Sequence, residues 1–366
     1  MLTDFGILTV RARDAWRTLR ASQKASVALG FAWPAQSVGG VRRHLDCIAR
    51  YSRFHVCEYP SAAAVRRWPD DGRKFYEEVA CRNALKQALI HSHVEPAFIR
   101  AGRAAQEQGK PWVHTYHLLY FKEDWNGTLL PWQEEINRCL VKEASLADVK
   151  LCVGNWFASH VSKEYSIQCE VIPNGVDVSA CDRADGRRFT AKFGLQRPIL
   201  FLNSLAPVKN PEAFVELARR LPGESFVMIG SSLTRPEIEK AMERSLPPNL
   251  FALGPMSHAD ALDAIAACRV FVMTSHREGL PTALLEAMAM SKPCVAPRGH
   301  GCLDAIGTDS CGFLYEPGNA EDLEQKMRAA LETPDVPAAR DRVLKHFSWE
   351  VVIPQIDAIY RRLLER

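Results

Sequence analysis

The stretch SHREGLPTALLEAMA, residues 275–289, carries the pattern that decides how this chain folds. The residues before it, Val270–Met273, form an apolar run typical of a buried strand. From Pro281 onward, leucine and methionine side chains recur at the spacing of one helix face. The stretch therefore predicts a strand, a short loop and a helix, which is the unit that builds parallel sheets.

The loop and the start of this helix also suit phosphate. Backbone N–H groups in the first turn of a helix have no partner within the helix and attract anions. The residues of this helix start are Gly279, Leu280, Pro281 and Thr282. Two carboxylates flank them, Glu278 in the loop and Glu286 in the second helical turn. Because a carboxylate repels phosphate, both are expected on hydroxyl groups, and the pattern favours a nucleotide sugar as ligand.

The same alternation of short apolar runs and longer amphipathic stretches extends over the rest of the chain. In the first half the expected strands are Ser26–Ala32, Phe54–Cys57, Ala88–Ser92, Trp112–Tyr116, Val149–Val153 and Glu170–Ile172. In the second half they are Ile199–Asn203, Phe226–Gly230, Leu250–Leu253, Val270–Met273 and Cys294–Ala296. We therefore expect an α/β protein with two Rossmann-like βαβ domains that face each other across a ligand-binding cleft.

The boundary between the two halves is expected in residues 179–197, which are polar, contain glycine and lack helical periodicity, as linkers do. This places the first domain at residues 1–178 and the second at residues 198–349. Within the second domain, Asn210, Ser257 and Asn319 have the side chains and positions of helix N-caps.

Composition excludes several classes of protein. The 366 residues carry 46 Lys and Arg against 43 Asp and Glu, a formal charge of +3, so no nucleic-acid-binding domain is expected. No apolar run reaches the roughly 18 residues of a transmembrane helix, and the first residues do not resemble a secretory signal. Eleven cysteines without a C-x-x-C pair favour reduced, buried thiols and a cytoplasmic protein.

One basic stretch near the N-terminus allows two interpretations. Its cationic side chains lie on one predicted amphipathic helix and are Arg11, Arg13, Arg17, Arg20 and Lys24. They form either a solvated helix face or a peripheral contact with the anionic inner face of a membrane.

Around the opening stretch the sequence resembles the retaining GT-B glycosyltransferases of family 4. Members carry an E-x7-E pair, which Glu278 and Glu286 match. Further motifs in the family's order are SVGGVRRHL (37–45), IHSH (90–93), VHTYH (113–117), VIPNGVDV (171–178), LAPVKNPE (205–212) and FSWE (347–350). The resemblance spans residues 26–366 and implies that a helix at residues 350–366 crosses back to the first domain.

The resemblance also implies catalytic and donor-binding roles. Lys209 would hold the diphosphate as negative charge grows on it, Glu286 the ribose hydroxyls and Glu278 the donor sugar. His117, at the end of a first-domain strand, would lie near the transferred sugar and act with Lys209 and Glu278 in catalysis. The expected donor site also includes Gly39, Gly40, Ser204, Gly230, Gly254, Met256, Gly279, Leu280, Pro281 and Thr282, with Gly254 and Met256 beside the base. For His91 and His93 a structural and a catalytic role both stay open.

The sequence departs from the family pattern at two places. Ser204 stands where the family commonly has an arginine beside the lysine, so Arg277 or Arg298 is considered as its substitute. The acidic residue of a common Gly-x-x-Glu pattern is Asp304 in GCLD.

These features predict a retaining glycosyltransferase that moves a sugar from a UDP- or GDP-sugar to a hydroxyl acceptor, such as a glycan, a glycolipid or a small metabolite. No D-x-D motif occurs, so no metal and no cofactor is expected. Two alternatives are a phosphorylase or epimerase on the same scaffold, and a catalytically weak sugar-nucleotide-binding partner subunit. The serine at position 204 keeps the last alternative open.

Overall fold

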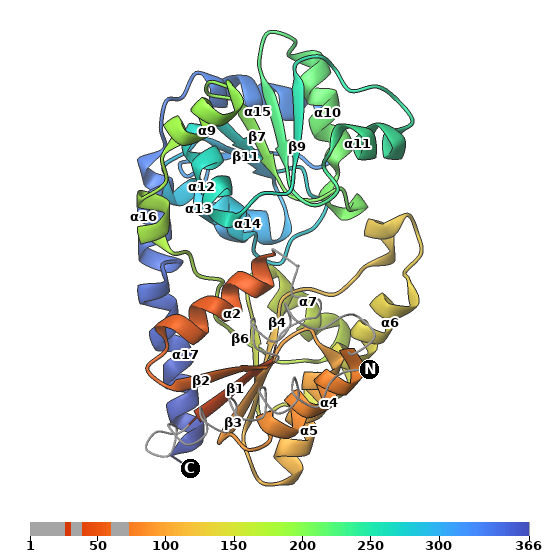
Figure 1. The fold of residues 1–366 in the computed structure, drawn as a ribbon, viewed down its shortest axis with the longest axis vertical. Coiled ribbons are helices and arrows are strands. Elements are labelled where there is room, and N and C mark those ends of the chain that lie inside the picture. The colour runs from red at the N-terminus through yellow and green to blue at the C-terminus, as the bar shows by residue number, and fades with distance from the viewer. Residues whose placement is uncertain (1–25, 31–38, 60–72, 366) are drawn as a thin grey trace, which may run out of the picture.

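The computed structural model describes residues 26–30, 39–59 and 73–365. The described chain forms two six-stranded sheets, one above the other in Figure 1, and every strand pair in them is parallel. Their strand orders are β2-β1-β3-β4-β5-β6 and β12-β11-β10-β7-β8-β9. This is the doubly wound arrangement, in which the carboxyl ends of parallel strands carry the ligand-binding loops.

The strands agree closely with the expected ones. The first sheet holds β1 (Ser26–Gly30), β2 (His55–Tyr59), β3 (Leu89–Ser92), β4 (Trp112–Tyr116), β5 (Val149–Cys152) and β6 (Glu170–Val171). The second holds β7 (Ile199–Leu202), β8 (Phe226–Ile229), β9 (Leu250–Gly254), β10 (Val270–Val272), β11 (Cys294–Pro297) and β12 (Phe313–Tyr315). Only β12 was not predicted, because its three residues lie between Gly312 and Pro317 and read as a loop.

Helices connect the strands and cover both sheets. In the first domain they are α2 (Gly40–Tyr51), α4 (Arg73–Ala84), α5 (Pro96–Glu107), α6 (Pro131–Arg138) and α7 (Asn155–Tyr165). After these come α8 (Val178–Asp182), α9 (Gly186–Phe193), α10 (Pro211–Arg220), α11 (Arg235–Met242), α12 (His258–Ala267), α13 (Thr282–Ala289), α14 (His300–Ile306), α15 (Ala320–Leu331), α16 (Pro337–His346) and α17 (Trp349–Leu364). The three expected N-caps are confirmed, since the side chains of Asn210, Ser257 and Asn319 each accept a backbone N–H of the first turn.

The segment expected as an irregular linker contains helices instead. Residues 179–197 include most of α8 and all of α9, and α9 packs on α12 through the buried Phe189. Asp263 of α12 fixes the start of α9, because its Oδ1 accepts the N–H of Asp185 at 2.8 Å and its Oδ2 pairs with Arg188 Nε at 2.6 Å. The sequence does hold local signals for α9, because Asp185 caps its start and Gly194 ends it in the left-handed conformation. The expectation of a linker overlooked them because the two helices are only five and eight residues long.

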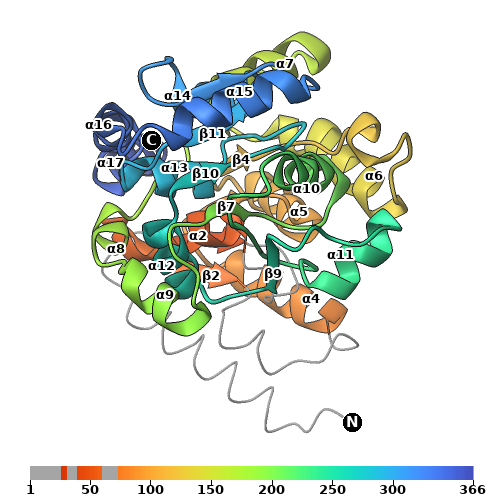
Figure 2. The same ribbon diagram turned by 90° about the horizontal axis from the view of Figure 1, so that it is seen from above.

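The second sheet has an apolar core on each face, and Figure 2 shows the helices around this sheet from above. Helices α12 and α13 pack with α16 on one face, and α10 and α15 cover the other. Its loops at the carboxyl ends of the strands point toward the first domain (Figure 1). A rigid scaffold thus presents these loops to the space between the two sheets.

The last helix, α17, returns from the second domain to the first, as the resemblance implied (Figure 1). Trp349, Ile356 and Tyr360 belong to the first domain's core. Asp357 is nearly buried and accepts hydrogen bonds from Ser52 Oγ at 2.6 Å and from the backbone N–H of Arg53 at 3.0 Å. This helix therefore ties the end of the chain to the start of the fold.

All eleven cysteines carry free thiols, nine of them buried. Among the described residues, no helix combines the length and the apolar character that crossing a membrane requires. The basic residues Arg11, Arg13, Arg17, Arg20 and Lys24 lie outside the described residues, so their contact with a membrane stays a prediction.

Candidate functional site

The stretch that decides the fold forms the centre of the site. Helix α13 begins at Thr282, one residue later than expected, and Pro281 is its N-cap in an extended conformation. Glu278 lies in the loop before it and Glu286 in its second turn, both nearly buried. The Leu280 carbonyl accepts a hydrogen bond from Asn174 Nδ2 at 2.8 Å, which anchors the loop from the first domain's side.

Lys209 and Glu278 contact each other. Lys209 ends a single 3₁₀ turn, Pro207–Lys209, and its Nζ lies 2.7 Å from Glu278 Oε1. The hydroxyl of Ser275 donates to the same carboxylate oxygen at 2.7 Å. The two side chains predicted to hold the diphosphate and the donor sugar therefore belong to one charged group.

The loops that carry Lys209 and Glu278 are joined by hydrogen bonds to backbone carbonyls. Thr274 Oγ1 donates to the Asn210 carbonyl at 2.7 Å, and the His276 N–H donates to the Val208 carbonyl at 2.8 Å. Ser204, before this turn, accepts the N–H of Ala206 at 3.5 Å through its hydroxyl. Charge at this place is thus fixed in position, as electrostatic stabilisation requires.

Glu286 has a partner that the sequence analysis missed. His258, the first residue of α12, places Nε2 2.6 Å from Glu286 Oε1, and its side chain is 24% exposed. The predicted base-contacting residues, Gly254 and Met256, come shortly before it in the chain. The N-cap at Ser257 placed His258 at the start of a helix, but no local pattern paired it with Glu286, which lies 28 residues further along the chain.

Two predicted donor-site glycines have structural reasons to be glycine. Gly230 has φ +144°, and a Cβ there would lie 1.5 Å from the Asn203 carbonyl oxygen. Gly254 has φ +70°, in the left-handed region, and its carbonyl accepts the Gly230 N–H at 2.9 Å. Both hold the ends of β8 and β9 close together beside the predicted donor site.

The two domains touch at the predicted site. A Cβ on Gly40, at the start of α2, would lie 3.2 Å from Thr282 Oγ1, while Gly39 is the N-cap of α2. A Cβ on Gly279 would lie 2.0 Å from the backbone oxygen of His117. The glycine loop and the end of β4 therefore reach the helix start of α13, as the predicted interdomain site requires.

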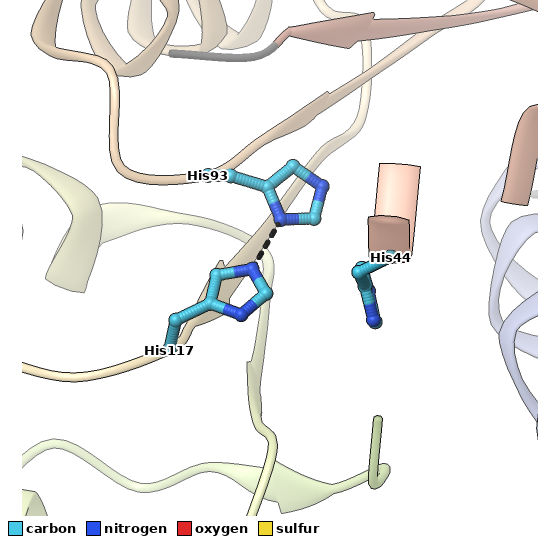
Figure 3. A group of neighbouring side chains, drawn as sticks. All are labelled: His44, His93 and His117. Carbon is cyan, nitrogen blue, oxygen red and sulfur yellow. Dashed lines mark hydrogen bonds between the residues drawn. The ribbon is translucent and has the colours of Figure 1, made fainter. Parts of the chain in front are cut away.

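His117 lies in a group of buried histidines (Figure 3). Its Nε2 is 2.9 Å from His93 Nδ1, and the His44 ring centroid is 5.1 Å from that of His117. Burial lowers the pKa of His44 to about 4 and holds the pKa values of His93 and His117 well below the usual value. These imidazoles are therefore neutral at pH 7.

His91 lies in the interior of the first domain, where both of its ring nitrogens have hydrogen-bond partners. Its Nδ1 lies 2.6 Å from the Tyr360 hydroxyl of α17, and its Nε2 lies 2.7 Å from Thr115 Oγ1. Both ring nitrogens are thus satisfied, and the ring stacks on that of His93 at 4.4 Å.

The two arginines considered as substitutes at position 204 have other partners. Arg277 pairs with the buried Asp124 of the first domain at 2.6 Å, and its guanidinium lies 4.0 Å from the centre of the Phe121 ring. Arg298 pairs with Asp309 and Glu316, both at 3.1 Å. Arg277 therefore joins the loop before α13 to the first domain, which no local sequence signal indicated.

Asp304, which stands in the family's Gly-x-x-Glu pattern, also joins the domains. Its Oδ2 accepts the N–H of Trp156, at the start of α7, at 2.9 Å. Burial raises the pKa of this carboxyl, and the backbone donors of α7 oppose that shift.

Two family matches cover most of the chain. Residues 31–180 match the family described as Glycosyltransferase Family 4, and residues 182–343 match Glycosyl transferases group 1. Among curated proteins, the D-inositol 3-phosphate glycosyltransferase of Segniliparus rotundus is 25% identical over 310 residues, 78% of this chain and 69% of that protein. The UDP-Gal:alpha-D-GlcNAc-diphosphoundecaprenol alpha-1,3-galactosyltransferase of Escherichia coli is 26% identical over 76% of this chain and 78% of that protein.

The fold is also found among solved structures. HepE of Anabaena in complex with UDP-glucose superposes with a TM-score of 0.74 over 92% of this chain and 100% of that one, at 17% identity. Since the identity is low, the similarity concerns the fold, which is the GT-B arrangement of two Rossmann-like domains.

Proposed function

Since this chain belongs to the glycosyltransferases that join a Family 4 domain to a group 1 domain, we propose that it transfers a sugar from a nucleoside diphosphate sugar to a hydroxyl acceptor with retention of configuration. UDP- and GDP-sugars are the donors proposed. A relative, the galactosyltransferase of Escherichia coli, has UDP-Gal in its name, and this supports the uridine nucleotide as the first donor to test.

The contact between Lys209 and Glu278 is the observation that carries the proposal. An ammonium and a carboxylate at 2.7 Å provide a cation for a diphosphate and an acceptor for sugar hydroxyls at adjacent points. In the proposed complex, Lys209 turns to the diphosphate, and Glu278 keeps its bond from Ser275 while accepting a sugar hydroxyl. Positive charge fixed beside the leaving group stabilises the transition state more than the ground state.

Glu286 and His258 are proposed to hold the nucleoside. The carboxylate of Glu286 has one oxygen bonded to His258 Nε2 at 2.6 Å, so its other oxygen is the acceptor proposed for ribose. His258 acts through Glu286 and is a positioning residue.

His117 is proposed to meet the sugar from the opposite side. Its backbone oxygen lies against Gly279, and the residue as a whole is 8% exposed, more than His44 and His93. In the proposed reaction the acceptor hydroxyl attacks on the face of the sugar from which the phosphate leaves. The departing phosphate takes the proton of that hydroxyl, so no separate general base is required.

The reaction is proposed to need no metal, because Lys209 and the first turn of α13 supply the positive potential that a bridging cation would otherwise provide. We expect full sugar transfer in excess EDTA on protein stripped of metal. Complete loss of transfer that magnesium or manganese restores contradicts metal independence and leaves the glycosyltransferase assignment intact.

The donor and the reaction are tested together. Thermal unfolding is measured with UDP, GDP, ADP and their sugars, and a ligand at 100 times its dissociation constant is expected to add about 2.7 kcal/mol of stability. The best donor is then incubated with glycan, glycolipid and small polyol acceptors, and the anomer formed is read by NMR. An inverted anomer contradicts retention, and phosphate-dependent cleavage or epimer formation without acceptor contradicts transfer.

A further inference from the structure

His44, His93 and His117 bring three imidazoles together at the domain interface. They come from α2, from the end of β3 and from the end of β4 (Figure 3). One ring nitrogen of each lies within 4.8 Å of one ring nitrogen of each other residue. His44 is 2% exposed, His93 0% and His117 8%.

The ring nitrogens in this group are under-satisfied. Within the described residues, neither nitrogen of His44 forms a hydrogen bond of ordinary geometry, and His93 Nε2 has no partner. The amide of Asn174 lies close enough to raise the pKa of His44 slightly against burial, and its own Oδ1 is unpartnered. Since a buried polar atom without a partner costs free energy, the two unpartnered nitrogens of His44 beside His93 and His117 indicate a ligand.

The chemistry of the group selects the kind of ligand. Neutral imidazole nitrogens are lone-pair donors and are among the preferred ligands of zinc and related divalent transition metals. No carboxylate belongs to this group among the described residues, so hard oxygen-seeking cations such as calcium and magnesium are disfavoured.

The geometry is close to that of a three-histidine site. In a tetrahedral zinc site with Zn–N bonds of 2.0–2.1 Å, two ligand nitrogens lie about 3.3 Å apart. His93 Nδ1 and His117 Nε2 are 2.9 Å apart and would separate slightly, and a ring nitrogen of His44 lies within 4.8 Å of a nitrogen of each. Asn174 Oδ1 is placed to accept the remaining N–H of His44, the kind of outer contact that orients a ligating histidine.

We propose that His44, His93 and His117 bind one divalent transition-metal ion of the zinc type, and that this ion inhibits sugar transfer. The inhibitory part rests on the proposed function, because it assumes that the ring of His117 faces the donor sugar. A metal that takes the lone pair of His117 Nε2 makes this nitrogen unavailable to the sugar. The metal site shares His117 with the proposed sugar site, whereas Lys209 and Glu278 do not belong to the histidine group.

Binding is tested on the full chain without any activity assay. Protein stripped by chelation and dialysis is titrated with Co²⁺, whose visible absorption reports tetrahedral coordination, and then with Zn²⁺ as competitor. We expect one Co²⁺ per chain, displaced by one Zn²⁺. His44→Phe removes both nitrogens while keeping a planar ring, and is expected to weaken binding by more than about 100-fold, above the range for losing an outer-shell contact.

The controls separate this site from surface binding. His346→Ala removes an exposed imidazole on α16 and is expected to bind Co²⁺ as the wild type does. His44→Asn serves if the phenyl ring disturbs folding, since it is smaller than histidine. The proposal is overturned if the folded wild type shows no tetrahedral Co²⁺ spectrum, or if a folded His44 variant binds as the wild type does.

Inhibition is measured afterwards by transfer in EDTA and in stoichiometric Zn²⁺. Zinc is expected to inhibit the wild type reversibly and to leave the rate of His44→Phe unchanged relative to the same variant in EDTA. Binding without inhibition overturns the inhibitory role. Transfer in EDTA judges the proposed function separately, so the two failures are distinguishable.

Discussion

The charge of Lys209 pairs with Glu278 in this structure and is proposed to pair with the diphosphate in the complex. Its ammonium contacts Glu278 at 2.7 Å and is 22% exposed, so it is partly shielded from water but can still reach a ligand. An interaction with a growing negative charge is stronger where water is partly excluded. Ser204, without a cation, leaves Lys209 a large share of the proposed leaving-group stabilisation.

We therefore predict that Lys209→Ala lowers turnover by about 10²–10³-fold, the scale for losing one strong preorganised donor. Steady-state transfer with saturating donor measures it, and Lys163→Ala, whose side chain is 85% exposed, is the control. Ser204→Arg in the Lys209→Ala background is expected to recover part of the loss. Near-normal transfer by Lys209→Ala means that the diphosphate binds elsewhere.

Glu286 is predicted to contribute to nucleotide affinity. Glu286→Ala removes a charged hydrogen-bond acceptor and is expected to cost about 1.5–3 kcal/mol of binding free energy. Calorimetry with the nucleoside diphosphate measures this, with Glu321→Ala, 81% exposed, as control. His258→Ala is expected to weaken binding less, because the carboxylate stays. Unchanged affinity of folded Glu286→Ala rules out the ribose assignment.

At this scale the sequence identified single residues better than their partners. The E-x7-E pattern located Glu278 and Glu286, but not their contacts with Lys209 and His258, because those contacts join loops from different strands. His44 was inside a recognised motif and still not singled out, since a histidine on a helix has no distinctive local pattern.

Between elements, the contact of Arg277 with Asp124 joins the loop before α13 to a 3₁₀ turn of the first domain, Lys122–Trp125. Asp124 is 6% exposed and Arg277 18%, and the guanidinium also lies over Phe121. Two residues 153 positions apart show no pairing signal in one sequence. The helices of residues 179–197 were missed because they are short, although Asp185 and Gly194 mark the ends of α9. Strands with long apolar runs were found within one or two residues.

Removing one partner of this partly buried pair is predicted to be costly. Asp124→Asn takes the carboxylate from Arg277, which keeps its contact with Phe121, and is expected to destabilise the protein by about 1.5–3 kcal/mol. Urea unfolding followed by tryptophan fluorescence measures it. The matched control is Glu170→Gln, which removes an exposed pair with Arg362 and is expected to cost about 0–1 kcal/mol. Equal effects of both substitutions contradict a role for the Asp124 pair in joining the domains.

At the scale of the whole molecule, the notable feature is a set of five buried histidines in the first domain. Burial lowers the pKa of His44 to about 4 and that of His114 to about 3, and it also holds the pKa values of His91, His93 and His117 well below normal. In the unfolded chain all five titrate near 6.5. The unfolded state therefore binds more protons below this pH, and the free energy of unfolding decreases as the pH is lowered.

Acid is accordingly predicted to destabilise this protein well above the range where carboxylates titrate. The stabilisation that comes from the neutral buried histidines is complete above about pH 6.5 and is lost as pH falls toward their folded-state pKa values. Between pH 7.5 and 5.5, His44 and His114 are therefore each expected to lower the free energy of unfolding by about 1.4 kcal/mol. The raised pKa of Asp304 acts in the opposite direction. Urea midpoints of metal-free protein at the two pH values measure the difference, and His114→Gln is expected to reduce it by about 1.4 kcal/mol. Equal midpoints at both pH values mean that these imidazoles reach water, and that the histidine group is open rather than buried.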